Sequence, residues 1–224
     1  MAEQFDYNQF SPLPFPTIQM GEGETRGERR DAAQHRQHIL QTARTLFTEH
    51  GVDNVSMHQV ARAAGVGQGT LYRRYAHKGL LCTALLNAGI IAFQERLLAY
   101  LEQTGEQIGA LERLYAVLVQ MLQFNESNAP LLSAITDAAC GERRSSQYAS
   151  PFYRWLRQVV VLLLQRAVER EEITVFDIEY AADIALLPSA IDFYLYQRQL
   201  PGFTSERIAA GLRQFLFSGL NPQS

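Results

Sequence analysis

The sequence predicts an all-α protein, and three observations lead to this fold class. Apolar residues recur at spacings of three and four along most of the chain, glycine-containing or polar breaks separate these stretches, and only short β-branched runs occur. The chain has 224 residues, of which 47% are hydrophobic and 19% charged, which suits a globular protein with a sizeable core. We expect a flexible tail over residues 1–30, a three-helix module over 31–78 and a larger helical domain over 79–224.

The three-helix module follows from periodicity and from two glycines. The first predicted helix covers residues 34–50 and stops at Gly51, because glycine favours the left-handed cap of a helix. A short second helix covers 56–64, Gly65 supplies a tight turn, and a third helix covers 68–75. Helix, glycine turn and helix together form a predicted helix-turn-helix.

The remaining chain alternates apolar helices with breaks. We expect a break at residues 125–128 and an interruption or kink at Pro188, because proline lacks the amide hydrogen that an internal helical turn needs. The predicted helices cover residues 78–101, 106–125, 130–139, 151–171, 177–199 and 204–218.

Charge is distributed unevenly along the chain. The formal net charge is only -3, which by itself argues against a nucleic-acid binder. Residues 26–80, however, hold nine Arg and Lys residues against four Asp and Glu residues, whereas residues 1–25 hold four acids and no base. A basic module between an acidic tail and an acidic body therefore favours a nucleic-acid partner.

The third predicted helix has the side chains that a DNA-reading helix needs. The major groove admits one helix, whose first residues meet the base edges. Gln68 can pair with adenine through two hydrogen bonds, and the spacing of Leu71 and Tyr75 turns both toward the core. The neighbouring side chains then point outward. The residues predicted to contact DNA are Ser56, Gln68, Gly69, Thr70, Tyr72, Arg73, Arg74 and Lys78.

These motifs resemble the N-terminal domain of TetR-type (tetracycline-repressor-like) transcriptional regulators. The resemblance covers about residues 34–85 and departs from the family pattern at Gly67, Arg74 and Gly79. The matching residues are Arg36-x-x-Ile39-Leu40-x-x-Ala43-x-x-Leu46-Phe47-x-x-x-Gly51, Ala61-x-x-Ala64-Gly65-Val66 and Gly69-Thr70-Leu71-Tyr72-x-x-Tyr75-x-x-Lys78-x-x-Leu81.

The resemblance implies a homodimeric repressor that binds a double-stranded DNA operator and senses a small-molecule effector in its C-terminal domain. The family opens its effector pocket in the core of that domain, so some residues that would otherwise be plain core are candidates to line it. Asn125 and Asp137 are the candidate polar anchors. The full candidate set is Phe93, Tyr115, Leu118, Met121, Asn125, Asp137, Trp155 and Val159.

The last two predicted helices carry more apolar residues than one buried side needs. Packed against their symmetry mates they would form a four-helix bundle, so we expect a homodimer through this surface. Its apolar residues are Ile184, Leu187, Ile191, Leu195, Ile208, Leu212, Phe215 and Leu216.

Other classes of function have little support in the sequence. His35 and His38 lack a third metal ligand nearby, no local catalytic motif occurs, and no cofactor is expected. The two cysteines fit a reducing cytoplasm, and no secretory signal or membrane span is predicted. Two alternatives stay open: a helical enzyme or small-molecule carrier with a silent DNA module, and an architectural DNA binder without ligand control.

Overall fold

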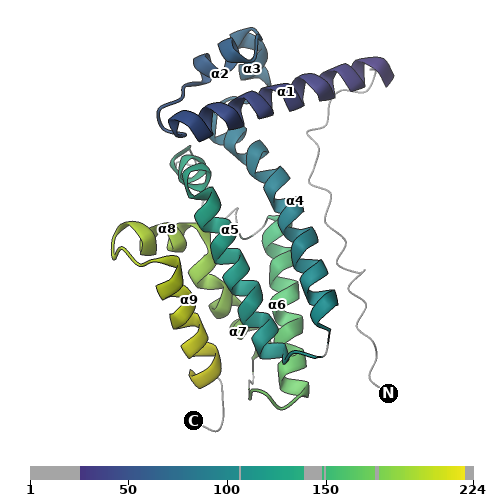
Figure 1. Ribbon diagram of the computed structural model, residues 1–224, viewed down its shortest axis with the longest axis vertical. Coiled ribbons are helices and arrows are strands. Elements are labelled where there is room, and N and C mark those ends of the chain that lie inside the picture. The colour runs from purple at the N-terminus through teal and green to yellow at the C-terminus, as the bar shows by residue number, and fades with distance from the viewer. Residues whose placement is uncertain (1–25, 106, 139–147, 149, 175–176, 220–224) are drawn as a thin grey trace. The chain divides into compact units, whose positions relative to one another are not determined.

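The structure is a computed structural model that describes every residue except 1–25, 106, 139–147, 149, 175–176 and 220–224. Within the described residues the regular elements are all helices, as the sequence predicts (Figure 1). The expected tail lies almost entirely outside the described residues. Its last residues belong to the first helix, because α1 spans Arg26–His50 and begins earlier than the periodicity predicts.

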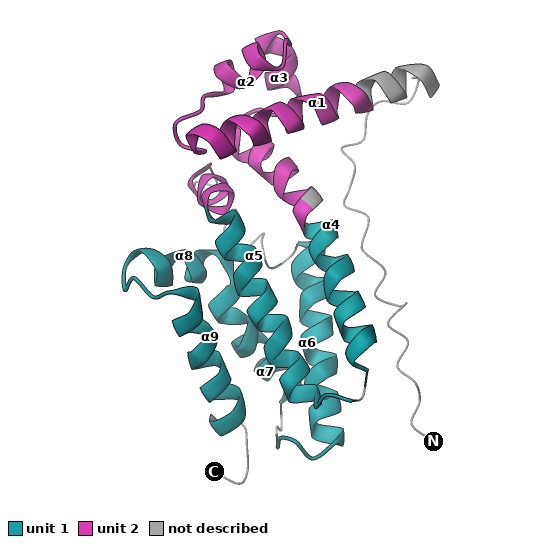
Figure 2. Cartoon of the chain, viewed as in Figure 1, with its two compact units in different colours: residues 1–13, 90–129, 145–224 teal, residues 14–89, 130–144 magenta. Residues whose placement is uncertain are grey.

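The described residues divide into two compact units (Figure 2). The first, called here the N-terminal unit, comprises residues 26–89 and 130–138, and the second, the C-terminal unit, comprises 90–129 and 148–219. The long helices α4 (Lys78–Thr104) and α5 (Ala110–Ala138) each contribute to both units. The predicted end of the helix-turn-helix at residue 78 falls where α4 begins.

The helix-turn-helix is formed by α2 (Met57–Ala63) and α3 (Gln68–Arg74), as predicted. The two glycines at the turns adopt the left-handed conformation, with φ of 81° at Gly51 and 63° at Gly65, which side chains with a Cβ atom disfavour. Their positive φ values explain why α1 and α2 end where the sequence predicts.

The core of the N-terminal unit is built from four helices and closed by the end of α5. Gly79 at the start of α4 lies so close to Ala138 that a Cβ atom placed there would be 2.5 Å from the Ala138 Cβ atom. A larger residue at Gly79 would therefore push α4 and α5 apart. The buried residues are Ile39, Ala43, Phe47, Val52, Val55, Met57, Val60, Ala61, Ala64, Leu71, Tyr75, Leu81, Cys82 and Leu85, with Leu131, Ala134 and Ile135 of α5 packed against them.

The helix α5 corrects the predicted break at residues 125–128. It is continuous through this segment and carries Pro130 inside it. Asn125 is not a helix stop, because it is buried and donates a hydrogen bond from Nδ2 to the Ser189 carbonyl at 2.7 Å. Asn128 donates to the Phe124 carbonyl one turn back at 2.8 Å, so its amide stays on the helix as well. Tertiary and local side-chain bonds have therefore overridden the loop preference of asparagine.

The rest of the C-terminal unit consists of helices that mostly match the sequence expectation. The Pro188 interruption is present as a single 3-10 turn, Leu187–Ser189, between α7 and α8. A π-helical turn, Phe215–Gly219, closes the last helix. The bounds are α6 Pro151–Glu169, α7 Ile178–Leu186, α8 Ile191–Gln199 and α9 Ser205–Gln214.

A distant carboxylate caps the start of α5. Glu172 accepts hydrogen bonds from the backbone amides of Ala110 at 3.0 Å and Leu111 at 2.8 Å. A negative charge at this end also interacts favourably with the helix dipole. The cap fixes α5 to the chain that follows α6.

By length and composition α4 could cross a membrane, with a mean hydropathy of 1.3 over its most apolar window. About half of this window, 47%, is however buried inside the protein. Leu81 and Leu85 are buried in the N-terminal unit, and Phe93, Leu97 and Leu101 in the C-terminal unit. This burial accounts for the composition of α4 without a membrane.

Candidate nucleic-acid interface and effector residues

The exposed side of α3 is polar, and its opposite side is buried in the core. Leu71 and Tyr75 are 0% and 2% exposed and pack in the core of the N-terminal unit, as their spacing predicts. The structure brings five of the predicted contact residues together as exposed positions of this one short helix: Gln68, Gly69, Thr70, Tyr72 and Arg73. An amide, a hydroxyl, a phenol and a guanidinium on one protruding helix can bond both base edges and phosphates.

Ser56 holds the start of α2 through a capping box. Its backbone amide donates to Gln59 Oε1 at 2.8 Å, while its Oγ accepts from the Gln59 amide at 3.2 Å. The side chain is exposed. Its hydroxyl therefore has a structural role in the helix start beside the predicted phosphate contact.

Two predicted contact residues are placed differently from the five on the face of α3. Lys78 is half-buried and donates from Nζ to the carbonyl oxygens of Val52 at 2.6 Å and Asp53 at 3.4 Å. Arg74 is also half-buried and already has an interaction partner. Both cations therefore belong partly to the packing of the N-terminal unit.

Four aromatic rings meet inside the C-terminal unit. Phe93 of α4 lies 5.2 Å from Phe124 of α5 and 5.8 Å from Phe152 of α6, measured between ring centroids. Trp155 stacks on Phe152 at 6.2 Å with the ring planes 19° apart. The rings join α4, α5 and α6 through their faces and edges, an arrangement that stabilises a core. We call Phe93, Phe124, Phe152 and Trp155 the aromatic cluster.

Comparison with known proteins supports the assignment of the helix-turn-helix. The model of the family described as bacterial regulatory proteins, tetR family, matches residues 39–85, which include the helix-turn-helix. An HTH-type transcriptional regulator of Staphylococcus aureus strain USA300 is 33% identical over 129 residues, which are 57% of this chain and 66% of the relative. The chain belongs to the TetR family of bacterial regulatory proteins. It spans just under two thirds of the length of the curated relatives that it matches.

Solved structures share the fold of this TetR-family chain over most of its length. A transcriptional regulator of the TetR/AcrR family from Thermobifida fusca matches with a TM-score of 0.61 and 20% identity, covering 83% of this chain and 98% of its own. A chain from Saccharomonospora viridis, crystallised in complex with choline, matches with a TM-score of 0.62 and 18% identity over 84% and 98%. At these identities the likeness establishes the fold alone.

Most effector candidates of the TetR-family chain are buried in its C-terminal unit. Tyr115 lies apart from the aromatic cluster, since it is half-buried and its ring faces the Arg213 guanidinium at 5.0 Å. Asp137 is exposed and belongs to the N-terminal unit, so the structure does not bring it to the other candidates. The buried candidates are Phe93, Leu118, Met121, Asn125, Trp155 and Val159.

The most unusual buried side chain, Gln94, is not among the residues predicted from the sequence. Gln94 is fully buried, and neither of its polar side-chain atoms has a hydrogen-bond partner among the described residues. It stands directly before Glu95 and Arg96, which are exposed, so it reads in the sequence as part of their polar face. A register count from Ile90 and Leu97, both buried, would have placed it inward.

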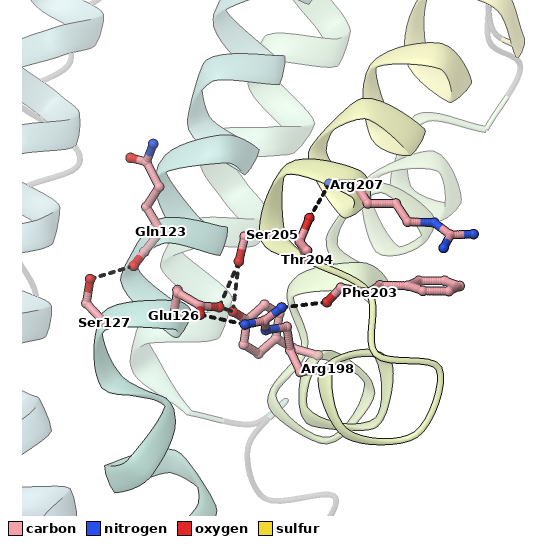
Figure 3. A network of polar contacts seen from close by, with 9 residues as sticks. Gln123, Glu126, Ser127, Arg198, Phe203, Thr204, Ser205 and Arg207 are labelled. Carbon is pink, nitrogen blue, oxygen red and sulfur yellow. Dashed lines mark hydrogen bonds and ion pairs between the residues drawn. The ribbon is translucent and has the colours of Figure 1, made fainter.

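A polar network that the sequence did not reveal joins α5 to the last two helices (Figure 3). Glu126 Oε1 accepts from the Arg198 guanidinium at 2.7 Å, and its Oε2 accepts from the Ser205 hydroxyl at 2.8 Å and from the Tyr194 hydroxyl. Arg198 also donates to the Phe203 carbonyl at 2.6 Å. We call Glu126, Tyr194, Arg198 and Ser205 the Glu126 network.

The Glu126 network shifts the pKa values of two of its members. The hydrogen bond from Tyr194 is the main cause that lowers the pKa of Glu126, and the bonds from Ser205 and Arg198 add to it. Burial, followed by the bond to Glu126, raises the pKa of Tyr194 to about 12. The network therefore holds a carboxylate and a neutral phenol together at neutral pH.

The apolar residues of the last two helices divide between the core and the surface. Leu195, Ile208, Leu212 and Leu216 are buried within this chain, and Ile184 and Ile191 are half-buried. Leu187 and Phe215 are each 41% exposed. Two exposed residues that sequence analysis did not single out, Phe193 and Tyr196 of α8, stack on each other at 5.8 Å.

Proposed function

We propose that this TetR-family chain is a ligand-responsive, DNA-binding transcriptional regulator, a repressor that a small molecule releases from a palindromic operator. The exposed polar face of α3 above its buried Leu71 and Tyr75 is the observation that carries the proposal. Entry into the major groove requires a short helix that is anchored in the core on one side. Its other side must be exposed and not covered by other described residues. Gln68 and Arg73 are the residues proposed to bond base edges, and Ser56, Tyr72 and Lys78 to bond phosphates.

Operator binding requires two copies of the module. One helix-turn-helix contacts few phosphates and binds weakly, because affinity rises with the number of phosphates that the protein neutralises. A homodimer doubles these contacts and fixes its half-sites about 34–36 Å apart or at a multiple of that distance. The proposed operator is therefore a near-palindrome.

The exposed side of α8 and α9 is the proposed dimer surface. Large apolar side chains are exposed at Phe193 and Tyr196 of α8, at Leu187 in the turn before α8 and at Phe215 in the turn after α9. Packing them against a second copy would remove them from water and form a four-helix bundle. The Glu126 network supports this surface from inside, since it ties both helices to α5.

The effector is proposed to act through the C-terminal unit. A chain of the same fold was crystallised with choline, and another is a ketosteroid transcriptional regulator of Mycobacterium tuberculosis. In this chain α4 and α5 contribute to both units, so a change in their packing in one unit can move their ends in the other. An effector that favours the non-binding state by about 1–3 kcal/mol is enough for useful control.

Two alternatives are distinguished by direct experiments. A helical enzyme or carrier with a silent DNA module would turn over or retain a metabolite and show no specific duplex binding. An architectural DNA binder would bind duplexes without any response to small molecules. We propose a cytoplasmic location because the DNA partner of a bacterial regulator lies there.

The test of the proposed function is selection of genomic DNA fragments by the purified full chain. We expect enrichment of fragments that share a near-palindromic sequence with half-sites spaced by whole helical turns. The same fragments should be lost when Gln68 and Arg73 are both replaced by alanine. Equal recovery of all fragments by wild type would contradict the proposal.

A further inference from the structure

The side chain of Gln94 has an unusual environment for an amide. It is 0% exposed on the apolar middle of α4, and both Oε1 and Nε2 lack a hydrogen-bond partner among the described residues. A buried polar group left unpaired loses its hydrogen bonds to water without replacing them, and Gln94 has two such atoms. Buried polar groups in native proteins are nearly always paired, so this residue requires an explanation.

Asn125 on α5 has the same feature on one side only. Its Nδ2 donates to the Ser189 carbonyl at 2.7 Å, while its buried Oδ1 lacks a partner among the described residues. Gln94 and Asn125 follow Phe93 and Phe124 in the chain, and these two rings lie 5.2 Å apart. Each amide is therefore one residue away from a ring of the same contact between α4 and α5.

This part of the C-terminal unit is apolar and aromatic. The aromatic cluster supplies ring faces from α4, α5 and α6, and its Phe93 and Phe124 directly precede the two amides in the chain. Such rings favour flat or apolar molecules, while a few polar atoms fix orientation, which is the usual composition of a small-molecule site.

The buried charges of this unit lie elsewhere. Among the described residues Arg113 is the one charged side chain that is almost fully buried, and its charge acts on Tyr100, six residues beyond Gln94 on α4. Glu126 follows Asn125 but is neutralised by Arg198 at 2.7 Å. A charged ligand between Gln94 and the aromatic cluster would therefore lose its hydration without gaining a counter-charge.

We propose that the effector of this regulator is an uncharged molecule with a flat apolar body and an amide-like group, whose donor and acceptor pair with Gln94 and with Oδ1 of Asn125. The inference rests on the proposed function and names the chemical class of its effector. A ligand that binds Asn125 would also be connected to other helices of the C-terminal unit. Asn125 holds the Ser189 carbonyl just before α8, and its neighbour Glu126 holds α8 and α9.

The test compares two probes that share one skeleton and differ in charge. Isothermal titration calorimetry of the full chain is carried out with 2-naphthamide, which is neutral with a donor and an acceptor, and with 2-naphthoate, which is an anion. The wild-type protein should bind 2-naphthamide at least about tenfold more tightly than 2-naphthoate, a difference of about 1.4 kcal/mol. Equal or tighter binding of 2-naphthoate, or a Kd for 2-naphthamide above about 1 mM, would overturn the proposal.

Two variants separate a ligand contact from a structural amide. Gln94→Leu should weaken 2-naphthamide binding at least about tenfold, while the thermal unfolding midpoint of the free protein stays the same or rises, because two unpaired polar atoms are removed. Gln158→Leu, at an exposed glutamine on α6, is the matched control and should leave binding unchanged. A lower midpoint in Gln94→Leu would show that water or another group already pairs this amide, and unchanged binding would show that Gln94 does not contact the probe.

DNA binding of the same preparations keeps the two proposals apart. Fluorescence anisotropy with the selected operator needs no effector, so Gln94→Leu should bind DNA as wild type does. If wild type binds its operator and the calorimetry fails, only the effector class is wrong. If the calorimetry succeeds and no DNA is selected, the proposed function is wrong.

Discussion

Lys78 at the start of α4 donates a hydrogen bond from Nζ to the carbonyl oxygen of Val52, 2.6 Å away in the turn after α1. A second, longer bond of 3.4 Å reaches the Asp53 carbonyl. The lysine thus fixes the first turn of α4 to the segment that precedes α2. Two of its three N–H groups serve this role, and the third remains for the phosphate that we propose it to bind.

We predict that Lys78→Ala lowers the free energy of unfolding by about 1.5–3 kcal/mol, the usual contribution of a charged hydrogen bond. Binding to all DNA sequences should weaken alike, and the dependence of log affinity on log salt should flatten by about one unit. Urea unfolding and anisotropy at several salt concentrations measure the two effects, with Lys78→Met as a control that keeps the aliphatic chain. An unchanged free energy of unfolding would show that the hydrogen bonds of Lys78 to Val52 and Asp53 do not stabilise the fold. An unchanged slope of log affinity against log salt would show that Lys78 does not contact DNA.

Lys78 illustrates what the sequence could and could not establish about the helix-turn-helix. Periodicity and two glycines were enough to place α2 and α3, because turn chemistry and burial of Leu71 and Tyr75 are local in the chain. Val52, which accepts the shorter bond from Lys78, lies 26 residues away in the chain, and no local pattern reports such a contact. The exposed residues of α3 could therefore be predicted from the sequence, but the internal role of Lys78 could not.

Arg73→Ala should weaken operator binding by about 1–3 kcal/mol and relax the preference at one base position. The side chain is exposed on α3, so little stability should be lost. Arg96→Ala, at an exposed arginine on α4 in the C-terminal unit, is the matched control and should bind DNA as wild type does. Competition with single-base operator variants measures the preference. Weaker binding with the same base preference would make Arg73 a phosphate contact instead.

The proposed dimer surface is tested by placing a charge at Phe215, one of its exposed aromatic residues. Phe215→Asp should convert the dimer into monomers, because an aspartate buried between two copies would lose its hydration without a partner. Ile91→Asp places the same charge at an exposed apolar residue of α4, which does not belong to the proposed dimer surface, and should remain a dimer. Light scattering coupled to size-exclusion chromatography gives the masses. A dimeric Phe215→Asp protein would show that the copies meet elsewhere.

The Glu126 network predicts a pH dependence of stability. Its hydrogen bonds lower the folded-state pKa of Glu126 below its ordinary value of 4.5. The stabilisation is therefore fully present above pH 4.5 and is lost as the pH falls through the lowered pKa. We expect Glu126→Gln to cost at most about 1 kcal/mol at neutral pH, because the carboxylate is partly exposed.

Thermal unfolding followed by circular dichroism between neutral pH and about pH 3 measures this loss. The difference in unfolding midpoint between wild type and Glu126→Gln should be largest at neutral pH and should disappear at the acid end of this range. Glu102→Gln, at an exposed glutamate of α4, is the control and should follow wild type throughout. Parallel curves for wild type and Glu126→Gln would show that the network does not stabilise the ionised carboxylate.

The C-terminal unit could be predicted only in outline. Helical periodicity located its helices, yet Asn125 and Asn128 suggested a break that buried and local hydrogen bonds prevent. The candidate effector residues were chosen for type, and most are buried together because large apolar residues gather in cores. Gln94 was missed because the chemistry of a buried amide depends on neighbours from other helices, which no spacing along one helix reveals.

The central claim is that the exposed face of α3 reads DNA, and the most direct measurement is binding of the purified wild-type chain to genomic fragments at low and physiological salt. The account predicts enrichment of a near-palindromic sequence, with half-sites about 34–36 Å or a multiple apart, that survives competition with unrelated DNA. Binding that shows no sequence preference at any salt concentration, and no dependence on Gln68 and Arg73, would contradict it.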